Sequence, residues 1–146
     1  MNAATWLLGF AALALFGCSN DCDLTDSTQL FAGDNAVDCG TADEAHDRGS
    51  IDDCATKAFG AGTAFVARYQ QQGTDSKLLT AVAMNTDGKV KVFRWDSSPC
   101  GGGSSCAPVT DVQACDGPTV ATQTSDDPSA LPIMCDSLGL AQRVCG

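Results

Sequence analysis

Histidine is almost absent from this sequence: His46 is the single histidine in 146 residues. Ser-His-Asp and Cys-His catalytic sites both need a histidine beside the nucleophile. His46 lies in a polar, acidic run, and we interpret it as a solvent-exposed surface residue. Structural zinc sites need clustered Cys or His ligands, such as a CxxC pair, and the sequence contains no such pair. We therefore predict no catalytic residue, no metal site and no cofactor.

Basic residues are also scarce. Eight Lys and Arg stand against 18 Asp and Glu, which gives a formal net charge of −10. This charge argues against nucleic acid as a partner, because phosphate contacts require a basic surface. Asp21, Asp23 and Asp26 could contribute oxygen ligands to calcium, but the glycine and glutamate of an EF-hand loop are missing. We prefer to interpret this region as a solvated acidic segment.

A hydrophobic stretch long enough to span a membrane is missing as well. The apolar run at residues 6–16 has eleven residues, with Gly9 among them, whereas a spanning helix needs about 20. No charged residue occurs in the first 17 positions. A short apolar core of this kind is typical of a cleaved signal peptide. We predict that residues 1–17 are a signal peptide.

The residues that end this run, Leu15-Phe16-Gly17-Cys18, resemble the lipobox of bacterial lipoproteins. The resemblance implies cleavage between Gly17 and Cys18 and attachment of lipid to Cys18. Two or three acyl chains give stable membrane attachment, where one chain gives marginal binding. Ser19 stands where bacterial retention signals have Asp. The resemblance therefore implies a lipid-anchored protein of the cell envelope, held on the outer membrane if the host has one.

Cysteine, by contrast, is abundant, and its number is odd. Nine cysteines would leave a stray thiol in an exported protein. Lipidation of Cys18 leaves eight candidates for up to four disulfides: Cys22, Cys39, Cys54, Cys100, Cys106, Cys115, Cys135 and Cys145. Disulfides in this number imply an oxidising compartment. The short glycine-rich spacing favours a Cys100–Cys106 pair, and we expect Cys135–Cys145 as a second local pair.

Composition divides the chain after the signal peptide. Residues 18–38 are acidic and low in hydrophobicity, and we predict a solvated tether there. Residues 39–146 contain no internal repeat, and we predict one small disulfide-rich domain. Within it, Ser50 and Asp53 fit a capping box, followed by apolar residues at helical spacing from residue 51 to 59. Gly60 then offers a left-handed C-cap.

Three strand-like runs follow the predicted helix: Thr63–Gln71, Leu78–Met84 and Lys89–Trp95. Turn sequences at residues 73–76 and 85–88 separate them, and the second contains Asp-Gly, a strong hairpin signal. The last run carries apolar residues on both faces. We therefore expect either a bulge near its middle or cover from a loop on the second face. Its aromatic side chains, like Tyr69 in the first run, are best interpreted as core residues.

The remaining residues, 96–146, show little periodicity, and five prolines disfavour long helices. Val109–Ala114 or Thr119–Gln123 could form short edge strands, and Leu131–Met134 is apolar enough to pack over the sheet. The predicted fold is therefore α+β: a short helix on a three- to four-stranded antiparallel meander, with disulfide-stabilised loops. This order of elements resembles that of cystatin-like folds, as an analogy of element order alone.

These features favour a lipid-anchored envelope protein, with a non-enzymatic domain that binds an envelope protein partner or has a structural role. An alternative, implied by the cystatin-like order, is an inhibitor or sensor module that inserts the turn at residues 73–76 or 87–88 into a target cleft. A third alternative is an uncharacterised exported hydrolase, which would require His46 and acidic residues to meet in a pocket.

Overall fold

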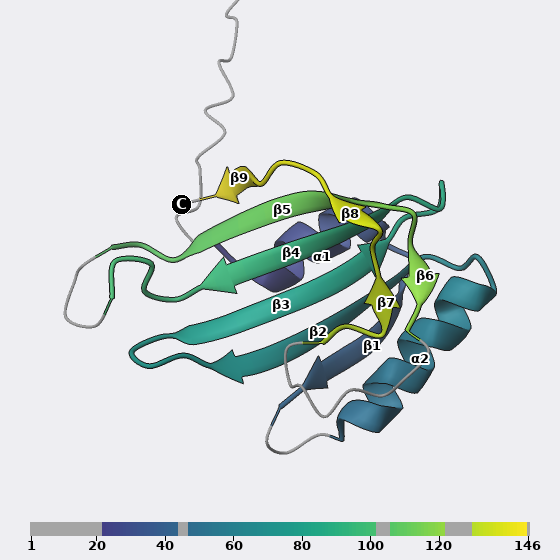
Figure 1. Cartoon of the computed structure of the whole chain (residues 1–146), viewed down its shortest axis with the longest axis horizontal. Coiled ribbons are helices and arrows are strands. Elements are labelled where there is room, and N and C mark those ends of the chain that lie inside the picture. The colour runs from purple at the N-terminus through teal and green to yellow at the C-terminus, as the bar shows by residue number, and fades with distance from the viewer. Residues whose placement is uncertain (1–21, 44–46, 102–105, 122–129, 146) are drawn as a thin grey trace, which may run out of the picture.

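The computed structural model describes residues 22–43, 47–101, 106–121 and 130–145. Two helices and nine strands follow one another along these ranges (Figure 1). They are α1 (Leu24–Ala32), β1 (Val37–Ala42), α2 (Arg48–Gly60), β2 (Phe65–Gln72), β3 (Lys77–Met84), β4 (Val90–Asp96), β5 (Val109–Asp116), β6 (Thr119–Val120), β7 (Ile133–Met134), β8 (Ser137–Leu138) and β9 (Gln142–Cys145).

A mixed seven-stranded sheet forms the centre of the fold. Its strand order is β1-β2-β3-β4-β5-β8, and β9 also pairs with β5. β1 is parallel to β2, and α2 makes the crossover that a parallel pair requires. β2 to β5 form an antiparallel meander. The predicted α+β class is confirmed, but the sheet is larger than the predicted three or four strands and is not purely antiparallel.

The meander agrees with the sequence-based prediction closely. The three predicted strands lie within two residues of β2, β3 and β4 at every end. Both predicted turns are present, closed by hydrogen bonds from the Gly73 amide to the Ser76 carbonyl and from the Gly88 amide to the Asn85 carbonyl. Gly88 has a positive φ of 75°, which explains why this turn contains the Asp-Gly pair.

The beginning of α2 differs from the prediction. Asp47 is the N-cap, and its carboxylate accepts a hydrogen bond from the Gly49 amide at 3.1 Å. Ser50 is therefore inside the first turn, where its hydroxyl donates to the Asp47 carbonyl, and the predicted Ser50–Asp53 capping box is wrong. At the other end, Gly60 is the last helical residue, and the positive φ falls on Gly62 instead. Asp is as good a cap as Ser, so the helix begins one turn earlier.

The structure also differs from the predicted tether at residues 18–38. Residues 24–32 form α1, capped by Asp23, whose carboxylate accepts a hydrogen bond from the Thr25 amide at 2.7 Å. Leu24, Thr28 and Ala32 are buried at four-residue spacing, which places them on one face of the helix. This face packs on the sheet, so α1 belongs to the folded domain and is not part of a solvated segment.

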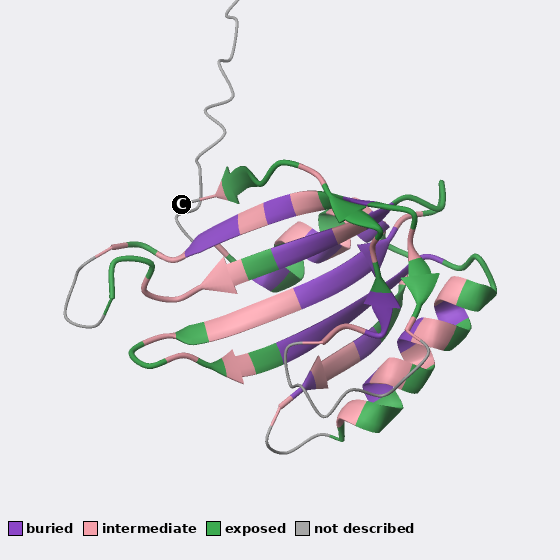
Figure 2. Ribbon diagram, viewed as in Figure 1, coloured by how far each residue is buried: buried purple, intermediate pink, exposed green. Residues whose placement is uncertain are grey.

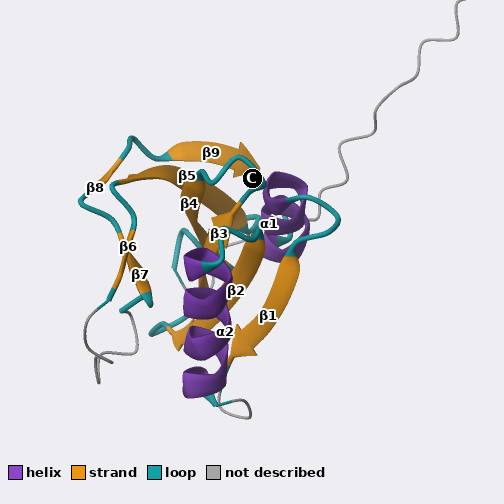
Figure 3. Ribbon diagram, turned by 90° about the vertical axis from the view of Figure 1, so that its right-hand side faces the viewer, coloured by secondary structure: helices purple, strands orange, loops and turns teal. Residues whose placement is uncertain are grey.

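Two apolar layers cover opposite faces of the sheet (Figure 3). On one side, α2 and β7 pack over β2, β3 and β4 with the buried side chains Ile51, Ala55, Ala58, Phe65, Ala67, Tyr69, Val82, Met84, Val90 and Ile133. On the other, α1 packs over Val66, Ala81, Ala83, Phe93 and Val112. The expected conflict between the faces of β4 is thus resolved by helical cover, and β4 pairs with β3 and β5 in unbroken register, without a bulge.

The segment after β4 contributes more to the sheet than predicted. β5 is an eight-residue strand that pairs with β4 on one edge and with β8 and β9 on the other. The expected cover by Leu131–Met134 is confirmed for Leu131 and Ile133, which pack in the α2 layer. Among the helices of the described ranges, none combines the length and the apolar character needed to cross a membrane.

The packing of α1 yields a first prediction. Leu24 is 1% exposed in the layer between α1 and the sheet, whereas Leu30 on the same helix is 89% exposed. Leu24→Ala should lower the free energy of unfolding by about 2–5 kcal/mol, because it removes buried methyl groups and leaves a cavity. Leu30→Ala, the matched control, should change it by no more than about 0.5 kcal/mol. Urea denaturation under oxidising conditions measures both, and equal effects would contradict the packing of α1.

Candidate functional site

The eight cysteines predicted to form disulfides do so in four pairs: Cys22–Cys145, Cys39–Cys54, Cys100–Cys106 and Cys115–Cys135. The predicted Cys100–Cys106 pair is confirmed. The predicted Cys135–Cys145 pair is wrong, because β5 places Cys115 beside Cys135, with their Cα atoms 5.2 Å apart. Cys145 lies instead beside Cys22, at a Cα–Cα distance of 5.5 Å.

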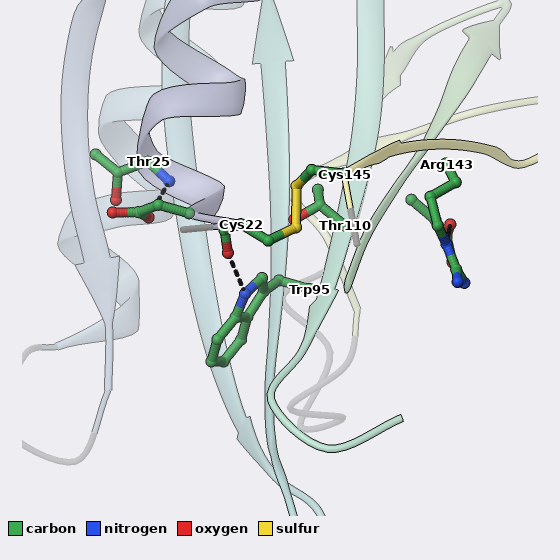
Figure 4. The surroundings of a disulfide bond; sticks show 8 residues. Cys22, Thr25, Trp95, Thr110, Arg143 and Cys145 are labelled. Atoms are coloured by element: carbon green, nitrogen blue, oxygen red, sulfur yellow. Dashed lines mark hydrogen bonds and ion pairs between the residues drawn. A yellow bond between two sulfur atoms is a disulfide. The ribbon is translucent and has the colours of Figure 1, made fainter. Parts of the chain in front are cut away.

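The Cys22–Cys145 disulfide joins the residue before the cap of α1 to the last residue of β9 (Figure 4). The indole Nε1 of Trp95 donates a hydrogen bond to the Cys22 carbonyl at 2.7 Å. The Thr110 hydroxyl lies 3.3 Å from the Cys22 sulfur. Cys18, the predicted lipidation site, lies outside the described residues, four positions before Cys22 in the sequence. We call this end of the molecule the Cys22–Cys145 end.

A second feature is a shallow cavity on the α2 side of the sheet. α2 and the β6–β7 pair cover one end of this face, and Figure 2 shows the far ends of β2, β3 and β4 to be partly exposed. The cavity there has a volume of about 510 Å³. Its lining includes Leu78, Thr80, Arg94, Asp96, Asp111 and Arg143, and we call this surface the open sheet face.

The register of the strands explains how these side chains meet. Arg94 on β4 lies opposite Thr80 on β3 and opposite Asp111 on β5. Side chains directly opposite one another on antiparallel strands share one face of the sheet. An adjoining hollow of about 330 Å³, bounded by β7 and β8, shares Arg94 and Leu131 with the first. Arg94 therefore stands where the two hollows meet.

The charges of the open sheet face are unevenly paired. Arg143 donates two hydrogen bonds to the Asp111 carboxylate, at 3.1 and 3.4 Å. Both side chains are well exposed, so this ion pair adds little to stability. Arg94 is exposed, and within the described ranges it has no hydrogen-bond or ion-pair partner. The open sheet face thus offers an unpaired guanidinium beside the apolar side chains of Leu78 and Leu131.

A polar cluster connects α2 to the sheet at the boundary of this face. The Tyr69 hydroxyl donates to the Asp52 carboxylate at 2.8 Å, and Arg48 lies 3.4 Å from the same carboxylate. The Arg48 guanidinium stacks over the Tyr69 ring at 5.1 Å and donates to the Ala130 carbonyl. Burial, and then the hydrogen bond to Asp52, raise the pKa of Tyr69 well above its usual value. Tyr69 therefore stays protonated and remains a hydrogen-bond donor to Asp52.

The aromatic residues of the strands belong to the core layers. Tyr69 and Phe93 are buried in the two core layers, and Trp95 packs against the α1 layer, as predicted for core aromatic residues. His46 lies outside the described residues, so its predicted exposure stays a prediction. Within the described ranges, no group of three or more His, Cys, Asp or Glu is placed to hold a metal ion.

The Cys22–Cys145 end yields a second prediction. The Cys22–Cys145 bond closes a loop with a sequence separation of 123, against 6 for Cys100–Cys106. Loop-closure entropy predicts that replacing both Cys22 and Cys145 by Ser lowers the free energy of unfolding by about 5 kcal/mol. The matched double replacement of Cys100 and Cys106 should lower it by about 2 kcal/mol. Urea denaturation of the two variants tests this order, and a larger loss for the Cys100–Cys106 variant would contradict it.

Comparison with known proteins gave no relative: no family model, no curated protein and no solved structure matches this chain.

Proposed function

We propose that this chain is a lipid-anchored protein of the cell envelope whose domain binds a partner and is not an enzyme. The observation that supports this most directly is the pairing of the cysteines. Eight of the nine cysteines are joined in four disulfides, which leaves Cys18 as the one cysteine outside these bonds. An odd cysteine in a lipobox-like sequence is accounted for by acylation, and the disulfides fit an oxidising compartment outside the cytosol.

The location proposed for the protein follows from the residues around Cys18. Leu15-Phe16-Gly17 precede it as a lipobox would, and Ser19 follows it. Cys18 would thus become the first residue of the mature chain and hold the domain at a membrane surface. In a host with two membranes, we propose the outer membrane as this surface.

The open sheet face is the surface that we propose for partner binding. It is concave, it combines Leu78 and Leu131 with polar side chains, and it presents the unpaired Arg94. Interfaces are typically built from apolar contacts with a few polar groups and are enriched in arginine. A protein of the same envelope, with an acidic or amide-rich surface opposite Arg94, fits this chemistry. A solvated face of this kind, without an activated nucleophile, suits binding better than catalysis.

The anchoring proposal predicts a definite mass. The full chain, expressed in a bacterial host and extracted from its membranes, should have lost residues 1–17 and gained two or three acyl chains on Cys18. Reduction and alkylation should reveal eight further thiols, since four disulfides open. Intact-mass spectrometry before and after reduction measures both. Cys18→Ser is the control and should lack the acyl mass, and a wild-type chain that retains its leader would contradict the proposal.

The binding proposal predicts a charge-specific loss. Arg94→Glu should reduce recovery of a cross-linked partner from native envelopes at least about tenfold, because it reverses the charge at the centre of the open sheet face. Lys57→Glu, the same charge change on the exposed side of α2, should leave recovery unchanged. Neither substitution buries a charge, so both variants should fold. Equal recovery with wild type and Arg94→Glu, or a hydrolase activity of the purified protein, would overturn the proposal.

A further inference from the structure

Most of the large apolar side chains that are exposed within the described ranges belong to one segment of the chain. Seven large hydrophobic residues of the described ranges are at least 40% exposed. Four of them, Met134, Leu138, Leu140 and Val144, belong to the segment from β7 to β9. The two most exposed, Leu30 and Leu140, reach 89% and 90%. Single exposed apolar residues are ordinary, but a group of them in one region marks an interaction surface.

Part of this group lies at the junction of α1 and β9. Leu30, Phe31 and Val144 line one hollow of about 250 Å³ there, between the helix and the sheet. Leu140 precedes β9 on the same sheet edge, two residues before Gln142, which pairs with Val112. We call Leu30, Phe31, Leu140 and Val144 the apolar rim. In Figure 3, α1 and β9 lie next to each other at the end of the molecule that holds Cys145.

The apolar rim begins beside the Cys22–Cys145 disulfide, whose Cys22 follows the proposed anchor in the sequence. Val144 is adjacent to Cys145, and Cys145 is bonded to Cys22. Cys18 is four residues before Cys22, and a chain extends by at most about 3.3–3.6 Å per residue, so it reaches no further than about 14 Å. If Cys18 is acylated, as proposed above, the Cys22–Cys145 disulfide is held within about that distance of the bilayer surface, and Val144 of the rim adjoins this disulfide.

We propose that the apolar rim seats the domain on the bilayer in which its own lipid is anchored. The inference rests on the proposed acylation of Cys18. Apolar side chains next to a lipid anchor add a second membrane contact to the first. Lys91 lines the same hollow, with its ammonium group 4.7 Å from the Phe31 ring centre. This arrangement of an apolar stem and a charged tip suits the headgroup region.

The charges nearby limit the kind of lipid surface. Asp26 lies one helical turn before Leu30, and Asp34 follows the end of α1; both are exposed. With Lys91 as the cation that lines the hollow, this surface is not basic, and attraction to anionic headgroups is not part of the proposal. The lipid anchor supplies the attachment, and the rim sets the orientation. A neutral, zwitterionic bilayer is the appropriate probe.

The proposed seating has a consequence for binding. The rim lies on the α1 side and edge of the sheet, whereas the open sheet face lies on the α2 side. A domain seated on the rim therefore keeps Arg94 and the open sheet face in the aqueous phase. The two surfaces do not compete for the same partner.

Fluorescence of an added tryptophan tests the seating. Removal of residues 1–17 leaves Trp95 as the single tryptophan. The emission of a tryptophan at a new position can therefore be obtained by subtracting the emission of Trp95. The lipidated full-length product is prepared as Leu140→Trp and, as the matched control, Val37→Trp, which replaces an exposed apolar residue of β1. Both are reconstituted in vesicles of phosphatidylcholine with brominated acyl chains, which quench indoles that contact them.

We expect the emission added by Leu140→Trp to be blue-shifted, because the indole would lie among apolar groups, and to be mostly quenched by the brominated acyl chains. The emission added by Val37→Trp should show neither effect. Equal responses, in protein whose intact mass shows the acyl chains, would overturn the seating and leave the proposed anchoring in place. A rim covered by a second copy or by another protein would be shielded from the brominated chains and would overturn it in the same way. A mass without acyl chains would overturn both.

Discussion

The structure depends on one constraint: the central strands are apolar on both faces, so both faces must be covered. Phe65 and Val66 are neighbours on β2, point to opposite faces and are both fully buried. β3 shows the same property over Ala81–Met84. A strand of this kind cannot have one face in water. α2 covers one face as the crossover between β1 and β2, and the second face requires another element, which is α1.

The position of α1 in turn determines where the Cys22–Cys145 disulfide forms. A helix of nine residues is not stable alone in water, so α1 is held by its packing and by the disulfide at its beginning. Packing α1 under β3 and β4 brings Cys22 to Trp95 and to Cys145. The contact between residues 123 positions apart is thus a result of core packing. Cys22, four residues after the proposed lipid site in the sequence, takes its position from the same contact.

The sequence predicted β2, β3 and β4 well because their alternation and turns are local signals. α1 was not predicted, because only Leu24 among its three buried residues is large and apolar, and the acidic surroundings lowered the mean hydropathy. The capping Asp23 and the four-residue spacing were its available signals. Sequence spacing predicted the Cys100–Cys106 disulfide, because these cysteines are only six positions apart. It failed for Cys145, because the partner of Cys145 is distant in sequence and depends on the topology of the sheet. The open sheet face needed the strand register, since no motif connects Arg94 to Asp111.

The two faces of the sheet are not covered to the same extent, and the strands carry polar side chains where the cover is missing. Along the α2 side of β4, Val90 and Val92 are buried, and the next residue on that face is the exposed Arg94. β3 changes in the same way, from Met84 and Val82 to the half-buried Thr80. The change from apolar to polar side chains falls where the cover by α2 and β7 ends. Because polar side chains stand where the cover ends, this part of the face needs no further cover for stability, and the partner binding proposed for it would not uncover the core.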